Sequence, residues 1–401
     1  MTRTRARNRP RLLLTVNDAG FFLSHRLPIA LAAREAGHDV HIATAPGPAV
    51  ERIVARGLPH HPVPISRSGL NPLGEFRCVA ALTRLYRRLR PDIVHHVTIK
   101  PVLHGGLAAR LARVPATVSA ISGLGYVFVD RARRPAPLRR AARAFYRLAL
   151  RQRNGRVIFQ NPDDRDAFVR GGLVQAGHAA LIKGSGVDLA RFAPAPEPPG
   201  EPMVVLPARM LWDKGVGEFV AAARRLRADG VKARFVLVGD TDPGNPTAIP
   251  PARLEAWRAE GAVEWWGHRD DMPAVLAGAH VVCLPSYREG LPKSLIEAAA
   301  CARPMVATDV PGCREIARDG ENALLVPARD DNALAMALAR LIGDPALRRT
   351  LGGRGRAIAE AEFAVERVVA QTLALYDALL AETGAAPARG GERPGMRCTP
   401  S

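Results

Sequence analysis

The stretch that decides the fold is PSYREGLPKSLIEAAACARP, which covers residues 285–304. The run before it, residues 281–284, is apolar and β-branched, as in a buried strand. A polar turn follows, and Pro292 suits the first position of a helix because its missing N–H would have no partner there. Strong helix formers continue to the Arg-Pro pair that closes the stretch. The segment therefore predicts a strand, a loop that carries Glu289, and a helix that carries Glu297.

Glu289 and Glu297 are placed to flank a ligand at the start of this helix. Backbone N–H groups near Gly290 and Leu291, together with the helix dipole, favour an anionic group such as a diphosphate. An ionised Glu only accepts hydrogen bonds, so both carboxylates can take the hydroxyl groups of a sugar or ribose beside it. An ordinary helix, with one Glu near its start and another on an exposed face, fits the same two residues.

Apolar runs and helical patterns alternate through the first half of the chain. This alternation predicts an α/β protein with a doubly wound, mainly parallel sheet. No internal repeat is visible in the sequence. We expect strands at residues 12–16, 40–44, 93–96, 116–121 and 157–160, and helices near residues 25–36, 49–56, 73–89, 102–112, 138–152 and 163–170.

A proline-rich join at residues 189–202 separates this half from a second α/β unit, because such a density of Pro excludes regular structure. The strands expected beyond it are residues 203–206, 233–238, 263–265, 281–284, 305–307 and 323–326, with helices near residues 216–227, 333–342 and 347–361. The predicted organisation is an N-terminal domain at residues 1–188, a linker at 189–202, a C-terminal domain at 203–362, a final helix at 363–384 and a loose tail at 385–401.

Length and composition indicate two domains of a cytosolic protein. A chain of 401 residues exceeds what one core usually holds, and 47% apolar residues make it globular. The five cysteines are scattered and lack C-x2-C spacing, so we expect reduced thiols and neither a zinc site nor a disulfide framework. No apolar run reaches the roughly 20 residues of a membrane-spanning helix, and the basic N-terminus lacks the features of a signal peptide.

The spacing of the two carboxylates, E-x7-E, resembles the motif of the retaining nucleotide-sugar glycosyltransferases of family GT4. The resemblance is strong over residues 267–327, which include GHRDDMP, DVPGCREI and GENALLVP, and it extends over about residues 11–383. It implies the GT-B fold, in which two Rossmann-like doubly wound domains face each other across a cleft and the final helix returns to the first domain. It also implies that the C-terminal domain binds the nucleotide sugar and the N-terminal domain binds the acceptor.

Arg209 and Lys214 stand in RMLWDKG, after the first strand of the C-terminal domain, and this heptapeptide looks like the family's R-x4-K-G donor signature. The resemblance implies that both side chains point at the donor diphosphate and neutralise the departing nucleotide, so that neither a metal nor another cofactor is needed. It also implies that Glu297 holds the ribose, whereas Glu289 holds sugar hydroxyls and stabilises positive charge at the anomeric carbon. The plain alternative is two surface cations after a strand.

Two further motifs bear on the donor site. His268 and Arg269 end another strand of the C-terminal domain, where the backbone reads the nucleotide base, often uracil, in the family. An ordinary loop histidine fits His268 equally well. Asp164 and Asp166 spell D-x-D, a metal motif of a different glycosyltransferase fold, but they follow Asn-Pro at a helix start, where N-capping is the expected role.

The loop NDAGFFLSHRLP, residues 17–28, joins the first strand to its helix. Gly20 permits close approach of the backbone to a phosphate, and a helix that begins near Ser24 would direct N–H groups toward it. The absence of G-x-G-x-x-G argues against an NAD-dependent oxidoreductase. Together with residues 97–106 and 119–126, the loop resembles the bacterial GT4 branch that adds a sugar, often an N-acetylhexosamine, to a polyprenyl-diphosphate-linked glycan.

One departure from the family concerns the position just after the fifth strand of the first domain, where many GT4 enzymes have a His near the reacting sugar. Here the residues are SAIS, 119–122. The role is either absent or passes to His25, Lys100 or His104, which together with Asn17 are the acceptor-side candidates. The plain alternatives are a helix-start histidine, a loop cation and a helix-face histidine.

Positive charge is concentrated in the first half of the chain. The net charge is +19, and residues 1–190 hold 31 Lys and Arg against 11 Asp and Glu. A half so basic predicts an anionic partner, namely nucleic acid, an anionic membrane surface or a pyrophosphate. Within residues 131–156, arginines recur every four residues from Arg139 to Arg151 beside an apolar stripe, as in a helix on an anionic bilayer. The same stripe could instead pack on the sheet, with the arginines in water.

These features predict a retaining glycosyltransferase that moves an N-acetylhexosamine or hexose from a UDP-sugar to a polyprenyl-diphosphate-linked glycan. The setting would be bacterial surface polysaccharide or glycoprotein-glycan assembly, on the inner face of the cytoplasmic membrane. A nucleotide-sugar epimerase of the same fold is the alternative, and it would convert a UDP-sugar without an acceptor. A nucleic-acid-binding protein is a weaker alternative, because no recognition module or aromatic-rich basic stripe is visible.

Overall fold

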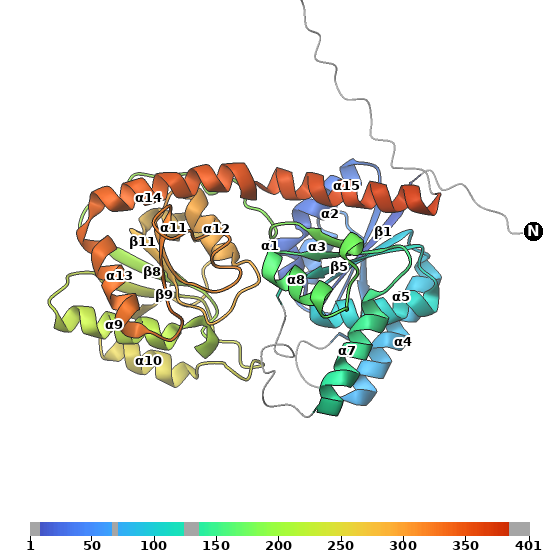
Figure 1. Cartoon of the computed structure of the whole chain (residues 1–401), viewed down its shortest axis with the longest axis horizontal. Helices are drawn as coiled ribbons and strands as arrows, with labels where there is room; N and C mark the ends of the chain where they lie inside the picture. The colour runs from blue at the N-terminus through green and yellow to red at the C-terminus, as the bar shows by residue number, and fades with distance from the viewer. Residues whose placement is uncertain (1–8, 66–70, 124–135, 385–401) are drawn as a thin grey trace, which may run out of the picture. The chain divides into compact units, whose positions relative to one another are not determined.

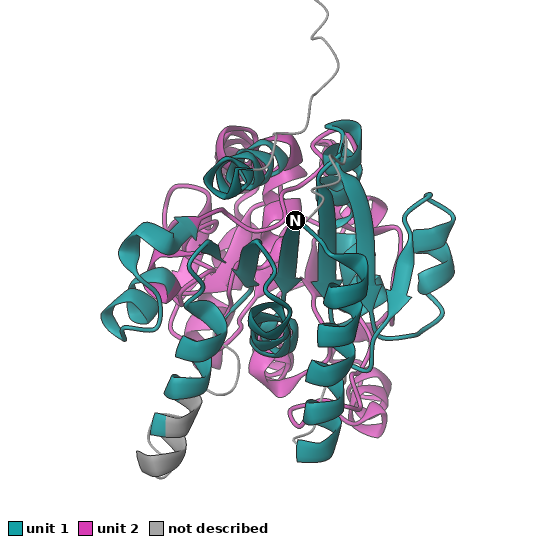
Figure 2. Ribbon diagram, turned by 90° about the vertical axis from the view of Figure 1, so that its right-hand side faces the viewer, with its two compact units in different colours: residues 1–159, 165–180, 369–401 teal, residues 160–164, 181–368 magenta. Residues whose placement is uncertain are grey.

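The structure, a computed structural model, describes residues 9–65, 71–123 and 136–384. The chain divides into two compact units (Figure 2). The first unit contains residues 1–159, 165–180 and 369–401, and the second contains residues 160–164 and 181–368. Residues 160–164 and 181–188, which are predicted above to belong to the N-terminal domain, thus fall in the second unit. There the N–H of Val187 donates to the carbonyl of Phe363, and its own carbonyl accepts from the N–H of Val365.

A seven-stranded sheet with the order β3-β2-β1-β4-β5-β6-β7 forms the centre of the first unit. The pairs from β3 to β6 are all parallel. All residues of β4 and β5 are buried, as expected for a parallel sheet that is covered on both faces. The strands are β1 (Arg11–Val16), β2 (Asp39–Thr44), β3 (His60–Pro62), β4 (Ile93–Val97), β5 (Ala116–Ile121), β6 (Gly155–Phe159) and β7 (Ala179–Leu181).

Helices connect these strands (Figure 1). Helix α4 shows how they are held, because its apolar face buries Leu82, Leu85 and Tyr86 against Leu13 and Val94 of the sheet. The helical segments are α1 (Ala19–His25), α2 (Leu27–Glu35), α3 (Val50–Val54), α4 (Pro72–Leu89), the π-helix η1 (Pro101–Gly105), α5 (Gly106–Ala112), α7 (Ala136–Leu150), α8 (Pro162–Arg170) and the short η2 (Ala176–His178).

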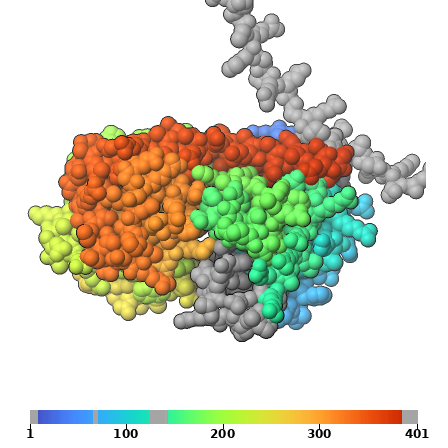
Figure 3. Space-filling model, viewed as in Figure 1, coloured from blue at the N-terminus to red at the C-terminus, as the bar shows by residue number. Residues whose placement is uncertain are grey.

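The second unit holds a six-stranded, all-parallel sheet with the order β10-β9-β8-β11-β12-β13. Buried apolar side chains of the strands and helices pack against it in several clusters. Figure 3 shows residues 331–358, which form helices α13 and α14, in orange-red on the surface of this unit. The strands are β8 (Met203–Pro207), β9 (Arg234–Val238), β10 (Glu264–Trp265), β11 (Val281–Leu284), β12 (Met305–Thr308) and β13 (Ala323–Val326). The helical segments are η3 (Trp212–Lys214), α9 (Val216–Ala228), α10 (Pro251–Ala259), α11 (Met272–Gly278), α12 (Lys293–Ala300), α13 (Asp331–Gly343), α14 (Pro345–Ile358) and η4 (Ala359–Phe363).

The last helix, α15 (Val365–Thr383), begins in the second unit and from residue 369 belongs to the first. Within the first unit, the hydroxyl of Tyr376 lies 2.6 Å from Nδ1 of His95 on β4, and both side chains are buried. Asn154 donates a hydrogen bond to the carbonyl of Leu379. The C-terminal segment is therefore anchored on the N-terminal sheet by polar contacts as well as by apolar packing.

Two expectations about the chain can be compared with the described residues. No helix among them is long and apolar enough to cross a membrane. Cys78, Cys283, Cys301 and Cys313 are buried free thiols, and burial raises the pKa of Cys78 and of Cys301 to about 11. Cys398 lies outside the described residues. The predicted reduced state thus agrees with these four thiols, whose burial makes them unreactive.

Candidate active site

The candidate donor residues lie where the strand order of the second sheet reverses. Strand β8 has β9 on one side and β11 on the other. Arg209 and Lys214 follow β8, and Glu289 follows β11. Open α/β sheets bind ligands at such a switch point, beyond the carboxyl ends of the strands. Two segments that are widely separated in the sequence, the one with Arg209 and Lys214 and the one with Glu289, therefore share the edge of the sheet where a ligand is expected.

Lys214 and Glu289 form an ion pair across this switch point. Nζ of Lys214 is 2.5 Å from Oε1 of Glu289, and the two side chains are 19% and 10% exposed. The hydroxyl of Ser286 donates to the same carboxylate oxygen over 2.7 Å. Gly215, at φ +72°, allows the close approach of the two loops, because a Cβ there would lie 2.1 Å from the carbonyl oxygen of Pro285. The ammonium and the carboxylate are thus fixed beside each other by backbone packing.

Arg209 is held by a different carboxylate. Its Nη1 lies 2.6 Å from Oδ2 of Asp242, in the segment after β9, and its side chain is 51% exposed. The resemblance implies that Arg209 and Lys214 both point at a diphosphate. In this structure each is instead paired with a different carboxylate, Asp242 and Glu289. An exposed ion pair contributes only about 0–1 kcal/mol, so a diphosphate could draw Arg209 away from Asp242 at little cost.

Helix α12 begins at Lys293, one residue later than predicted. Pro292 is its N-cap, with an extended backbone, and not its first helical residue. The carbonyl of Pro292 starts the helix by accepting from the N–H of Leu295 over 3.1 Å. Glu297 is buried to 7% exposure, and its Oε1 lies 2.8 Å from Nζ of Lys293, one turn earlier. The predicted placement of Glu297 inside the helix is confirmed, with Lys293 as a partner.

The loop between β11 and α12 is clamped from two sides. Asn161, in the segment of residues 160–164, donates from Nδ2 to the carbonyl of Gly290 over 2.7 Å. Gly312, at φ +85°, lies so close that a Cβ would be 2.5 Å from the same oxygen. Leu291 is 9% exposed and packs in the apolar cluster around α12. The carbonyl of Gly290 and the side chain of Leu291 are thus committed to the protein.

The D-x-D segment takes part in this clamp. The expected N-capping comes from Asn161, whose Oδ1 accepts from the N–H of Asp164 over 2.8 Å, and not from an aspartate. The buried carboxylate of Asp164 instead lies 2.8 Å from Nη2 of Arg288. Burial raises the pKa of Asp164, against the opposing effects of Asn161 and Arg288. Asp166 pairs with Arg165.

His268 and Arg269 lie on an exposed loop after β10. The backbone N–H of His268 donates to Oδ1 of Asp240, which follows β9, over 3.1 Å. The guanidinium of Arg269 makes two hydrogen bonds to Asp271, at 2.8 and 2.6 Å. The loop is therefore anchored by its backbone to the end of the neighbouring strand, while the His268 side chain remains 66% exposed.

In the first unit, the prediction for the loop after β1 is wrong about where the helix begins. Helix α1 begins at Ala19 and not near Ser24, because the carboxylate of Asp18 caps it by accepting from the N–H of Phe21 over 2.8 Å. Gly20 is consequently in the first turn of the helix and not in a loop before it. His25 ends this helix, with its ring stacked 4.0 Å from that of Phe21. Asn17 directly follows β1.

Lys100 and His104 share one carboxylate that the sequence analysis did not single out. Nζ of Lys100 lies 2.7 Å from Oε1 of Glu75, and Nε2 of His104 lies 2.8 Å from Oε2. Burial lowers the pKa of His104, against the opposing effect of Glu75. Glu75 lies in the first turn of α4, whereas Lys100 caps η1 and His104 lies within it, so the three residues tie α4 to the helical turn that follows β4.

In the described part of the basic segment, residues 136–156, three of the arginines have partners that the sequence does not reveal. Tyr146 and Ala149 of α7 are buried, while Arg143, Arg147 and Arg151 donate hydrogen bonds to the carbonyls of Gly171 and Gly172, just after α8. These arginines are exposed but engaged with the end of a helix, where a cation is stabilising. The side chain of Arg139 lies outside the described residues.

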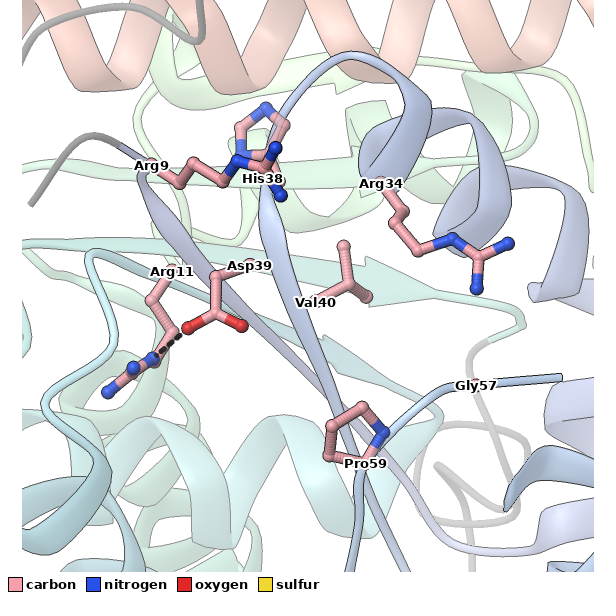
Figure 4. Close-up of a pocket in the computed structure, with 8 residues that line it drawn as sticks. All are labelled: Arg9, Arg11, Arg34, His38, Asp39, Val40, Gly57 and Pro59. Atoms are coloured by element: carbon pink, nitrogen blue, oxygen red, sulfur yellow. Dashed lines mark hydrogen bonds and ion pairs between the residues drawn. The ribbon is translucent and has the colours of Figure 1, made fainter. Parts of the chain in front are cut away.

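A pocket of about 510 Å³ in the first unit lies at the opposite edge of the sheet (Figure 4). An ion pair of Arg11 with Asp39, 2.7 Å long, lies within it. It contains none of the predicted site residues, and it opens at the amino ends of β1 and β2. Its lining residues are Arg9, Arg11, Arg34, His38, Asp39, Val40, Gly57 and Pro59. This pocket is therefore distinct from the candidate active site.

The residues that the sequence analysis missed are mostly partners of the predicted ones. Lys293 could have been found, because it stands four residues before Glu297 on a predicted helix. Asp242 and Glu75 carry no such signal, since each lies in a segment far along the chain from the cation it binds. Only the fold brings these pairs together.

Comparison with known proteins gives two family matches that together cover most of the chain. Residues 11–161 match the family described as "Glycosyl transferase 4-like" and residues 201–344 match "Glycosyl transferases group 1". N,N'-diacetylbacillosaminyl-diphospho-undecaprenol alpha-1,3-N-acetylgalactosaminyltransferase of Campylobacter jejuni is 29% identical over 380 residues, which cover 91% of this chain and 98% of that protein. Putative glycosyltransferase EpsD of Bacillus subtilis is 28% identical over 90% of this chain and 94% of its own length.

Solved structures show the same fold. A sucrose-phosphate synthase from Thermosynechococcus elongatus matches with a TM-score of 0.74 and 24% identity, over 93% of this chain and all of that chain. HepE of Anabaena in complex with UDP matches with a TM-score of 0.72 and 19% identity, over 92% of this chain and all of its own. These neighbours have the GT-B fold, and the two parallel-sheet units of this chain agree with it.

Proposed function

Because the chain belongs to the GT4 family of glycosyltransferases, we propose that it transfers a sugar from a nucleoside diphosphate donor with retention of the anomeric configuration. The donor is a UDP-sugar, either an N-acetylhexosamine or a hexose. The acceptor is a polyprenyl-diphosphate-linked glycan of bacterial surface polysaccharide or glycoprotein-glycan assembly. The observation that carries the proposal is the ion pair between Lys214 and Glu289 at the switch point of the second sheet.

Lys214 supplies the positive charge that the leaving diphosphate needs. Transition-state charge is stabilised best by groups that are already in place, and Lys214 is held by the packing of its loop against that of Glu289. Arg209 is exposed and weakly paired, so it can turn to the diphosphate when the donor binds. Two cations serve the role that a metal ion has in other glycosyltransferases, and we expect the reaction to need no metal.

The two carboxylates have separate tasks in this proposal. Glu289 holds hydroxyls of the donor sugar and stabilises the positive charge that develops at the anomeric carbon as the bond to phosphate lengthens. Glu297 accepts hydrogen bonds from the ribose hydroxyls, with Lys293 fixing its carboxylate. The backbone that joins β10 to α11, around His268 and Arg269, reads the base.

The acceptor assignment is supported by the Campylobacter relative, whose name describes a diphospho-undecaprenol-linked substrate. The excess of Lys and Arg in residues 1–190 also suits a lipid-linked diphosphate at an anionic membrane surface. We therefore propose a peripheral position on the inner face of the cytoplasmic membrane. Binding to vesicles with and without anionic lipid would test it.

The proposed activity is tested by offering the protein a panel of UDP- and GDP-sugars together with a bacterial membrane lipid extract. Release of UDP that depends on the lipid, with formation of a glycolipid bearing an α-linked sugar from an α-linked donor, is the expected result. A nucleotide-sugar epimerase would instead convert the UDP-sugar into its epimer without lipid. Release of GDP alone, or an inverted product, would contradict the proposal.

A further inference from the structure

The pocket at the amino ends of β1 and β2 has a basic wall that the proposed function does not use (Figure 4). Its volume of about 510 Å³ is in the range of sites for small molecules, which is about 300–1,000 Å³. Among its eight lining residues, three arginines stand against one aspartate. The wall therefore carries more positive charge than its own carboxylate can neutralise.

Arg11 engages the acids at this end of the sheet. Its Nε lies 2.7 Å from Oδ2 of Asp39, and its Nη1 donates to the carbonyl of Leu89 over 2.5 Å. The backbone N–H of Arg11 donates to Oδ2 of Asp92 over 2.6 Å. Because Asp39 is the one carboxylate in the lining and is already paired, the uncompensated charge of the wall belongs to Arg9 and Arg34.

Arg34 is fixed in place but keeps most of its hydrogen-bond donors. It lies in the last turn of α2 and is exposed, and its Nη1 donates to the carbonyl of Arg56 over 2.6 Å. A guanidinium has five N–H donors, so one bond to a carbonyl leaves others for a ligand. In the view of Figure 4, the side chains of Arg9 and Arg34 lie on either side of Val40. A ligand in the pocket can thus meet two cations from different directions.

His38 adds a buried polar atom to the same wall. The residue is 2% exposed, and its Nδ1 has no hydrogen-bond partner within the described part of the chain. The ring packs edge-on against that of Tyr376 in α15, with centroids 6.1 Å apart, and this contact fixes its orientation. A buried polar atom without a partner is uncommon, because it has lost its water and gained nothing in return. Nδ1 therefore indicates that a polar ligand completes the wall.

The protonation state of His38 suits a ligand that accepts hydrogen bonds. Burial lowers the pKa of His38, against the opposing effects of Asp377 and Asp92, so the ring is neutral at pH 7. A neutral imidazole can carry its proton on Nδ1 and donate it. The wall then offers one N–H from a neutral ring and the N–H groups of two guanidiniums, all of them donors.

This set of donors fits a phosphate group better than it fits a carboxylate. A phosphate monoester has about 1.5–2 negative charges at pH 7 and three acceptor oxygens, enough to engage two guanidiniums and an imidazole at once. Guanidinium groups bind phosphate oxygens in pairs through their planar fork. The remaining volume, beside Val40 and Pro59, leaves room for the rest of the ligand.

We infer that this pocket is a second ligand site, which binds a phosphate group through Arg9, Arg34 and His38. The phosphate belongs either to a soluble phosphorylated compound or to the headgroup of an anionic lipid, because both present the same chemistry to the wall. The inference does not rest on the proposed function, since none of the residues proposed for the donor or the acceptor lines the pocket.

The test follows the ring of His38 in the full chain. The protein is labelled with ¹⁵N-histidine and titrated with inorganic pyrophosphate, and the ring signals of His38 and His268 are recorded by NMR. The variants His38→Gln and His268→Gln assign these signals. His268 reports on the proposed donor site, so the two signals separate binding in the pocket from binding at the donor site.

Two variants alter the pocket without touching its buried part, namely Arg34→Gln and the double variant with Arg9→Gln. Arg110→Gln is the matched control. Arg110 is an exposed arginine of the same unit that donates to a backbone carbonyl, that of Arg151, over 3.2 Å, and it does not line the pocket. Sedimentation with phosphatidylcholine vesicles, with and without phosphatidic acid, is the second arm. Circular dichroism verifies that each variant is folded.

We expect pyrophosphate to shift the His38 signal in a saturable manner in the wild type and in Arg110→Gln. The Kd from these shifts should rise by about fivefold or more in Arg34→Gln, and further in the double variant. Vesicle binding of Arg34→Gln that equals that of Arg110→Gln would identify a soluble ligand, whereas weaker binding to phosphatidic acid vesicles would identify a lipid headgroup. A shift at His268 alone, or equal Kd values in Arg34→Gln and Arg110→Gln, would overturn the inference.

Discussion

Lys214 and Glu289 come from loops 75 residues apart, yet Nζ and Oε1 are 2.5 Å apart at the switch point of the second sheet. The two loops meet because β8 and β11 are adjacent strands and because Gly215 leaves room for the carbonyl of Pro285. The pair is largely shielded from water, so it is not an ordinary surface salt bridge. A cation fixed there is available for a diphosphate without reorganisation.

Removing this cation should slow the reaction more than it disturbs the fold. We expect Lys214→Ala to lower kcat by about tenfold or more, because the leaving diphosphate loses a prearranged positive charge. Lys232→Ala is the control, since Lys232 is an exposed lysine of the same unit in the loop between α9 and β9. Initial rates of UDP release give the comparison. Equal rates in the two variants would remove Lys214 from the mechanism.

Glu297 should matter for donor binding. Glu297→Ala loses charge-assisted hydrogen bonds to the ribose, each of which contributes about 1.5–3 kcal/mol, so kcat/KM for the donor should fall by about tenfold or more. Glu255→Ala serves as control, because Glu255 is half exposed on α10 and pairs only within its own helix. Thermal unfolding of both variants shows whether the buried Glu297 is also needed for stability. Donor kinetics that stay at wild-type values in Glu297→Ala would exclude the ribose role.

Gly312 offers a test of the loop that carries Glu289. At φ +85°, a Cβ on Gly312 would lie 2.5 Å from the carbonyl oxygen of Gly290 and 2.7 Å from that of Glu289. Gly312→Ala should therefore cost about 1–2 kcal/mol of backbone strain and about 1–3 kcal/mol of overpacking, and it should displace the carboxylate.

Gly320→Ala is matched to this variant, because Gly320 has φ +69° but no atom within 4 Å of the added Cβ. It should show the backbone strain alone and retain activity. Urea unfolding and initial rates of both variants are compared. If Gly312→Ala and Gly320→Ala lose equal stability and equal activity, close packing of the two loops is not what holds Glu289.

The histidines at the β2–β3 edge predict a pH dependence of stability. Burial, followed by the charge of His41, lowers the pKa of His61 to about 4. Between pH about 6.5 and 4 the unfolded chain takes up a proton at His61 that the folded protein does not, so the free energy of unfolding falls as the pH falls through this window. Because His61 is only half buried, we discount the effect to about 1 kcal/mol between pH 7 and 5. In His61→Gln the decline measured by urea unfolding should be shallower, and an identical slope would contradict the assignment.

The elements that were predicted correctly are those in which the apolar run and the residues that flank it indicate the same bounds. Strands β5, β11 and β13 have the predicted bounds, because each is a short apolar run between clear breakers. Helices α10 and α11 were not predicted. Each buries two side chains, which is too few to give a clear helical pattern of apolar residues in the sequence. The predicted helix start near Ser24 was wrong because the capping role of Asp18 was not recognised. The carboxylate of Asp18 accepts from the N–H of Phe21 and starts α1 at Ala19.

The candidate site was predictable as a set of residues but not as a set of contacts. The positions of Lys214 and Glu289 at strand ends follow from the alternating pattern, and their meeting follows from the strand order. The engagement of Arg209 with Asp242 depends on a long segment after β9 whose path no spacing rule determines. The same holds for Arg143 and Arg147, whose partners are backbone carbonyls beyond α8.

The most direct measurement is calorimetric titration of UDP into the wild-type protein and into a variant that combines Lys214→Ala with Glu297→Ala. The account predicts one site per chain in the wild type and an affinity lower by about tenfold or more in the variant, without loss of the folded state. UDP binding of equal strength to both proteins would show that the nucleotide does not bind beyond the ends of β8 and β11, and would contradict the proposed donor site.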